Sequence, residues 1–160
     1  MKGLNKYTKM KTTFFLWALR AFLFILVVAL QGCGKTDLER NPYLPEIQFT
    51  VPVDLSLPQY DNLRYAGGAL LLPQYGHKGI ILFNLNGTTY FAWEASCPHH
   101  APSNCSQTQI NGVLTTCACE DYQYSLATGQ LINPAEGQTT IYSLVNYRLE
   151  NQGTRLIISN

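Results

Sequence analysis

The sequence predicts an all-β fold, an antiparallel sandwich, over residues 46–160. Short strand-like segments alternate there with turn residues, and this spacing is typical of sandwiches and partly open barrels. Two pairs, Asn86-Gly87 and Asn111-Gly112, each separate two segments of strand composition, which is a strong short-range signal for a hairpin. No part of this range shows the apolar period of about 3.6 residues that marks an amphipathic helix. We therefore expect one β domain in this chain of 160 residues.

Each expected strand is bounded by turn residues. The first hairpin pairs 79–85 with 88–95, and Asn86-Gly87 is expected to form a type I′ turn, whose two central residues both need positive φ angles. The second hairpin pairs 108–110 with 113–116. The other expected strands are 47–53, 69–72, 122–126, 130–132, 141–149 and 154–158.

The first 32 residues are typical of an export signal. The first twenty residues hold five basic side chains and no acidic one, and an unbroken apolar run follows over 21–30. Such a run is too short to span a bilayer, which takes about 20 residues. A basic start before a short apolar run instead describes a signal peptide that is later removed.

The segment Leu30-Gln31-Gly32-Cys33 resembles the lipobox of bacterial lipoproteins, in which the cysteine receives a lipid. The resemblance implies a signal peptide over 1–32, a lipidated tether over 33–45 and a domain over 46–160, anchored to a membrane of the cell envelope. The residue after Cys33 is not the Asp that retains some lipoproteins in the inner membrane, which favours the outer membrane. The alternative is an N-terminal anchor helix that stays uncleaved.

The charge balance argues against nucleic acid as a partner. From Cys33 onward the chain has six basic and ten acidic residues, and a mildly acidic domain without a basic stripe is a poor nucleic-acid binder. Among the acidic residues, Glu94 lies at the end of an expected strand and is interpreted as a solvated side chain.

Four cysteines of the domain lie close together in the sequence, at Cys97, Cys105, Cys117 and Cys119. They fall in two loops, 97–105 and 117–124, each directly after an expected strand. An even number of cysteines in an oxidising compartment indicates disulfides, a metal centre or both.

The two loops resemble the two motifs of the Rieske iron–sulfur family. Cys97-Pro98-His99 matches the first motif, Cys-x-His, and Cys117 begins the second motif after a spacing that fits the family. Tyr124 stands where the second motif has an aromatic residue, whose hydroxyl would bond a cluster sulfur. The resemblance implies an antiparallel sandwich with a small cluster-binding subdomain and a [2Fe–2S] cluster. It implies an electron carrier or accessory domain for an unknown redox partner protein, rather than an enzyme by itself.

The second motif departs from the family at the position of its histidine. Glu120 stands where the second histidine ligand belongs, and Asp121 replaces the following glycine. A Rieske centre needs two thiolates on one iron and two imidazoles on the other. The cluster hypothesis therefore uses Cys97, His99 and Cys117, with Glu120 or His100 as a non-standard fourth ligand.

The resemblance also implies a disulfide, because Rieske proteins of quinol-oxidising complexes join an extra cysteine from each loop. Cys105 and Cys119 stand in those places. In a second hypothesis the cluster has been lost and a further bridge, Cys97–Cys117, closes as well. The domain would then be a binding or structural module stapled by disulfides.

Two more kinds of chemistry are open to these loops. In a third hypothesis about four of the cysteine and histidine groups bind zinc. Thiol–disulfide exchange at Cys117-Ala118-Cys119 is disfavoured, because the negative charges of Glu120 and Asp121 would raise the pKa of a thiol there.

Overall fold

The computed structural model describes Trp17, Arg20 and residues 41–160, and residues 41–160 form one compact unit. The predicted signal peptide, the lipid site Cys33 and most of the predicted tether lie outside the described residues. Of the tether, Asn41–Pro45 is described, and Leu44 is buried there. In the part of the chain that the structure describes, no helix is long and apolar enough to cross a membrane.

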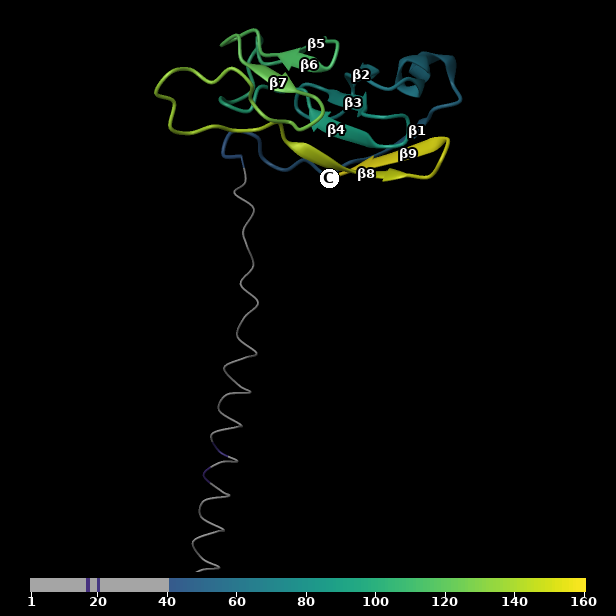
Figure 1. Ribbon diagram of the computed structural model, residues 1–160, viewed down its shortest axis with the longest axis horizontal. Helices are drawn as coiled ribbons and strands as arrows, with labels where there is room; N and C mark the ends of the chain where they lie inside the picture. Colours follow the sequence, from purple (N-terminus) through teal and green to yellow (C-terminus); the bar gives the residue numbers. More distant parts are fainter. Residues whose placement is uncertain (1–16, 18–19, 21–40) are drawn as a thin grey trace, which may run out of the picture. The chain divides into compact units, whose positions relative to one another are not determined.

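Two antiparallel sheets build residues 41–160 (Figure 1). The larger sheet has the strand order β1-β9-β8-β4-β3-β2, and the smaller has the order β5-β6-β7. The strands are β1 (Thr50–Asp54), β2 (Ala69–Leu72), β3 (Ile80–Asn84), β4 (Tyr90–Glu94), β5 (Gln109–Asn111), β6 (Leu114–Thr116), β7 (Gln123–Ser125), β8 (Asn146–Asn151) and β9 (Arg155–Ser159). The predicted antiparallel β fold is confirmed, and it includes a second, smaller sheet.

The largest differences between the observed and the predicted elements are three. A short 3₁₀ helix, η1 (Pro58–Arg64), follows β1 where no element was expected, and a proline stands in its first turn, where a missing N–H costs nothing. The expected strand 130–132 is reduced to a single bridge between Leu131 and Tyr124. The expected strand 141–149 begins only at Asn146.

Both predicted hairpins form, but their turns are not of type I′. The first joins β3 to β4 through residues 85–89, and the second joins β5 to β6 through Gly112-Val113. Gly87 and Gly112 have positive φ angles, whereas the asparagines before them do not. In the first turn, the Asn86 side chain instead accepts hydrogen bonds from the backbone N–H groups of the two following threonines. In the second, a positive φ at the first central residue alone fits type II′.

Strand β3 lies between two hydrophobic cores, because all five of its residues are buried. Successive side chains of a strand point to opposite faces. Ile80 and Leu82 therefore pack into the core of the larger sheet, whereas Ile81 and Phe83 pack into a second core. This second core includes Cys97, Cys117, Trp93, Tyr124, Leu126 and Leu144, of which Tyr124 belongs to the smaller sheet.

Candidate functional site

The two cysteine-bearing loops meet at one end of the domain formed by residues 41–160. The first loop (95–108) connects β4 to β5, and the second loop (117–122) connects β6 to β7. The first loop closes on itself through Cys97 N–H, which donates to Ser106 O at 2.8 Å, and the second through Cys117 N–H, which donates to Tyr122 O at 2.8 Å. A cysteine near the start of each loop is thus held by a backbone hydrogen bond to a residue near the end of the same loop.

All four cysteines are joined in disulfides. The inner disulfide, Cys97–Cys117, links Cα atoms 5.7 Å apart and is fully buried. The outer disulfide, Cys105–Cys119, links Cα atoms 5.4 Å apart and lies toward solvent, since Cys105 is exposed. The outer bridge is the one that the family resemblance implied. The two bridges interleave along the sequence, because Cys105 lies between the two cysteines of the inner bridge and Cys117 lies between the two cysteines of the outer one.

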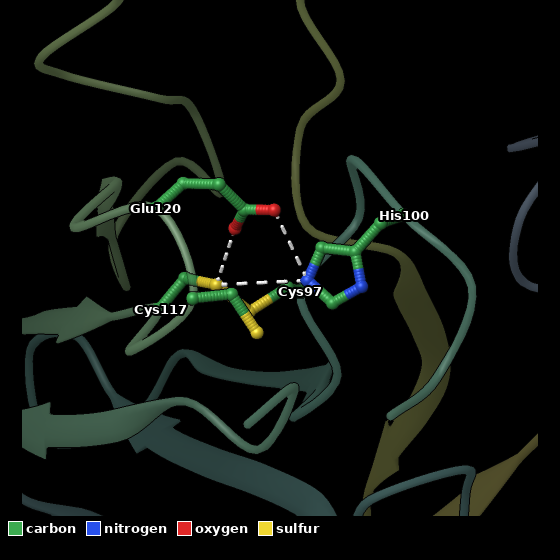
Figure 2. A group of neighbouring side chains, drawn as sticks. Cys97, His100, Cys117 and Glu120 are labelled. Carbon is green, nitrogen blue, oxygen red and sulfur yellow. Dashed lines mark hydrogen bonds and ion pairs between the residues drawn. A yellow bond between two sulfur atoms is a disulfide. The ribbon is translucent and has the colours of Figure 1, made fainter. Parts of the chain in front are cut away.

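His100 and Glu120 lie against the sulfur of Cys117 (Figure 2). Glu120 Oε2 is 2.9 Å from Cys117 Sγ, and His100 Nε2 is 4.0 Å from the same sulfur. The imidazole and the carboxylate also contact each other, with 3.3 Å between His100 Nε2 and Glu120 Oε1. A sulfur in a disulfide has no hydrogen to donate, so a thiol proton can bridge Cys117 to Glu120 only after the inner disulfide opens.

His99, the predicted ligand of the first motif, faces a group of tyrosines. Its Nδ1 is 2.9 Å from the Tyr124 hydroxyl, and its Nε2 accepts the backbone N–H of Tyr142 at 3.1 Å. Because Nε2 is an acceptor, the neutral ring has its proton on Nδ1 and donates it to Tyr124. The rings of Tyr122 and Tyr142 also pack against it. Both nitrogens of His99 are occupied, and the Tyr124 hydroxyl is bonded to this histidine rather than to a sulfur.

We expect the protonation of His99 to lower the stability of the domain. Burial, and then the charge of His100, hold the pKa of His99 below its ordinary value of 6.5. As the pH falls below 6.5, the unfolded chain binds the proton before the folded one, so the free energy of unfolding decreases until the folded pKa is passed. Above that range His99 is neutral in both states, and it adds no pH dependence.

Urea unfolding between about pH 5 and 8 measures this effect. The parent chain should lose stability toward the acid end more steeply than the His99→Gln variant, which lacks the titrating ring. Equal slopes for the two proteins would show that His99 does not contribute.

The residues of the two loops do not fit a Rieske-type cluster. Such a cluster takes two free thiolates and two imidazole nitrogens. The sulfurs of Cys97 and Cys117 are bonded to each other, and both nitrogens of His99 are engaged elsewhere. Glu120 offers an oxygen where the second imidazole belongs. His100, which sequence reasoning ranked behind His99, is the histidine that faces the sulfurs.

Glu94 is a structural residue that the sequence analysis misjudged. It is fully buried, so its interpretation as a solvated side chain is wrong. Its carboxylate accepts the backbone N–H groups of His77 (2.8 Å), Lys78 (3.0 Å) and Ser96 (2.8 Å), and also the hydroxyl of Tyr147. Burial, and then the charge of Glu94, raise the pKa of Tyr147. These donors replace the water that a buried carboxylate loses.

No local sequence signal marks this buried carboxylate, but in the structure it constrains a glycine in the turn before β3. A Cβ on Gly76 would lie 2.6 Å from Glu94 Oε2, so only glycine allows the backbone to approach the carboxylate this closely. Because Ser96 precedes Cys97 directly, Glu94 also fixes the start of the first loop.

These two sheets, with the motif-bearing loops at one end, have the antiparallel β architecture that the family resemblance implied. No protein-family model matches the sequence, and no curated protein matches it either. Several solved structures have a similar fold at low sequence identity.

One neighbour is a chain from the complex of reduced oxygenase and oxidised ferredoxin of carbazole 1,9a-dioxygenase. It is 14% identical, with a TM-score of 0.44 over 72% of this chain and 94% of that chain. The ferredoxin of carbazole 1,9a-dioxygenase from Nocardioides aromaticivorans IC177 is 14% identical, with a TM-score of 0.42 over 67% and 95%. A protein of Mycobacterium tuberculosis, assigned as an NADH-dependent nitrite reductase small subunit, is 16% identical, with a TM-score of 0.42 over 72% and 97%.

A longer chain in another complex of the same oxygenase and ferredoxin also matches. The present chain spans 29% of its length, at 14% identity and a TM-score of 0.46 over 74% of the present chain. At this level of similarity, nothing about the ligand or activity of the present chain follows from its neighbours.

Proposed function

We propose that residues 41–160 are a cluster-free Rieske-like domain, closed by two disulfides, which acts as a binding or structural module in an oxidising cell envelope. The observation that supports this function is the inner disulfide, because it occupies both thiolates that a cluster would need. The orientation of His99 toward the tyrosines agrees with it. One-electron transfer to a partner protein through a [2Fe–2S] cluster is the competing function.

Iron, sulfide and thiol contents distinguish the two functions. The full chain, produced with its own N-terminus in a bacterium that builds iron–sulfur clusters, is purified and denatured for these measurements. We expect no iron, no acid-labile sulfide, and no thiol that an alkylating agent can label among the four loop cysteines. Iron and sulfide in near-equal amounts, with free thiols at Cys97 and Cys117, would instead establish the electron carrier.

A matched variant verifies the thiol measurement. In Cys97→Ala the partner Cys117 has lost its bridge, so one labelled thiol should appear at that residue, while the outer disulfide stays closed. A Cys117 that is labelled equally in the parent and in the variant would contradict the inner disulfide.

The proposed function includes a lipid anchor at Cys33. Its support is the lipobox-like segment before this residue together with the two disulfides, since stable disulfides are typical of exported proteins. Cells grown with a labelled fatty acid should incorporate the label into the full chain but not into the Cys33→Ser variant. A variant that is labelled as strongly as the parent would exclude this residue as the site of attachment.

A further inference from the structure

The inner disulfide lies within a wider group of metal-binding side chains. Five residues each place one ligand atom within 4.8 Å of the ligand atoms of the other four: Cys97, His100, Cys117, Cys119 and Glu120. Two of these sulfurs are bonded to each other and a third is bonded to Cys105, so this group cannot bind a metal while both disulfides are closed.

We propose that reduction of the inner disulfide creates a site for one zinc-like divalent cation, held by Cys97, Cys117, His100 and Glu120. This inference goes beyond the module proposed above, and it concerns the reduced state of the same loops. It differs from a Rieske centre in taking a single metal ion without sulfide and in using His100 instead of His99.

The distances among the four groups support a tetrahedral site. Zinc binds sulfur at about 2.3 Å and nitrogen or oxygen at about 2.0–2.2 Å, so neighbouring ligand atoms of a tetrahedral site are about 3.3–3.8 Å apart. Separations near that range already join the three side chains: 2.9 Å from Cys117 Sγ to Glu120 Oε2, 3.3 Å from the other carboxylate oxygen, Glu120 Oε1, to His100 Nε2, and 4.0 Å from His100 Nε2 to Cys117 Sγ. A rotation of the carboxylate then suffices to present a single oxygen to the metal. The sulfurs of Cys97 and Cys117 are bonded to each other, so this bond must be reduced before both can bind the metal.

The second nitrogen of His100 is arranged as in metal-bound histidines. His100 Nδ1 is 2.8 Å from Ala101 O, so the neutral ring donates its proton to this carbonyl and keeps the lone pair on Nε2. Metal-ligating histidines commonly donate their other N–H to a backbone carbonyl, which fixes both the tautomer and the ring orientation. Figure 2 shows Nε2 directed toward the sulfur and the carboxylate.

The outer disulfide offers a route for opening the buried one. A small dithiol can reach the exposed Cys105–Cys119 bond and reduce it to two thiols, becoming a cyclic disulfide itself. The negative charges of Glu120 and Asp121 oppose the thiolate form of Cys119, so the next step is slow. The Cys119 thiolate that does form lies within 4.8 Å of both inner sulfurs, attacks the inner bond and releases one inner thiolate. Attack of Cys105 on the mixed disulfide re-forms the outer bond and releases the second. In sum, two electrons pass from the dithiol to the inner pair, and the two thiols lose their protons when the metal binds.

Cobalt titration of the reduced full chain tests the site. The chain carries Cys33→Ser so that its only cysteines are those of the loops, and it is reduced with a dithiol and desalted without oxygen. Adding Co²⁺ should give one equivalent of binding, with the visible bands of tetrahedral cobalt and thiolate-to-cobalt charge transfer, and Zn²⁺ should remove both. The oxidised chain should bind none.

Neighbouring residues provide matched controls. His100→Ala should weaken cobalt binding at least about tenfold, whereas His99→Ala should retain the affinity of the parent. Glu120→Gln should weaken it, whereas Asp121→Asn should not. The proposal would be overturned if His100→Ala bound cobalt as tightly as the parent, or if only His99→Ala lost cobalt affinity. If Glu120→Gln bound cobalt as tightly as the parent, the assignment of Glu120 as the oxygen ligand would be overturned.

Circular dichroism measured in the same titration covers the case in which reduction unfolds the chain. Cobalt should then restore the β spectrum, because metal binding and folding are coupled. A reduced chain that stays unfolded with excess cobalt, or that folds without binding it, would contradict the site. The iron and thiol contents of the oxidised chain are measured separately, so failure here is distinguishable from failure of the proposed module.

Discussion

Removing the inner disulfide by Cys97→Ala with Cys117→Ala should lower the free energy of unfolding by about 4 kcal/mol. The bridge spans a sequence separation of 20 residues, and closing such a loop stabilises by about 3 kcal/mol in the chain-entropy model. Both sulfurs are fully buried in the second core, so the emptied space adds about 1 kcal/mol. Denaturant unfolding of the oxidised proteins measures the difference.

The matched control removes the outer disulfide by Cys105→Ala with Cys119→Ala. Its separation of 14 residues gives a similar entropy contribution of about 3 kcal/mol, but Cys105 is exposed and little packing is lost. The inner double variant should therefore be the less stable of the two. An inner variant that loses less than about 1 kcal/mol would indicate that Cys97 and Cys117 are not bonded in solution.

Replacing the buried carboxylate by Glu94→Gln should lower the free energy of unfolding by about 3 kcal/mol. The amide has nearly the same shape, but its NH₂ group would face backbone N–H donors that now point at an oxygen. A buried donor without a partner costs about 1–3 kcal/mol, and hydrogen bonds to a charged acceptor are the stronger kind. The measurement is denaturant unfolding at neutral pH.

Glu150→Gln is the matched control for that substitution. Glu150 is exposed on β8, and its ion pair with Arg148 is a surface contact at 3.2 Å. Exposed pairs of this kind contribute about 0–1 kcal/mol. If Glu94→Gln proved as mild as Glu150→Gln, the hydrogen bonds around Glu94 would not be stabilising the fold.

The sequence predicted best what depends on neighbours in the chain. The hairpin of β3 and β4 followed from two apolar runs around Asn86-Gly87, and the outer disulfide followed from the resemblance of the loops to known motifs. The type I′ turn predicted for Asn86-Gly87 was wrong, because the backbone of Asn86 does not adopt a positive φ angle and its side chain instead accepts hydrogen bonds from two backbone N–H groups.

What the sequence could not predict depends on contacts between distant residues. His99 and His100 are adjacent, and their different directions are decided by Tyr124 and Tyr142, which lie 25 and 43 positions away from His99. Glu94 is buried because donors from a separate turn and from β8 surround it, including Tyr147 at a separation of 53. No periodicity within one segment contains this information.

The crossed order of the two bridges has a consequence for a protein exposed to proteases. Every peptide bond between Cys97 and Cys119 is enclosed by at least one of the two links, and those between Cys105 and Cys117 are enclosed by both. A single backbone nick anywhere in this stretch would therefore leave the two fragments covalently attached. Both loops contribute exposed residues to this stretch, and a cut at any of those residues would not separate the chain into two free fragments.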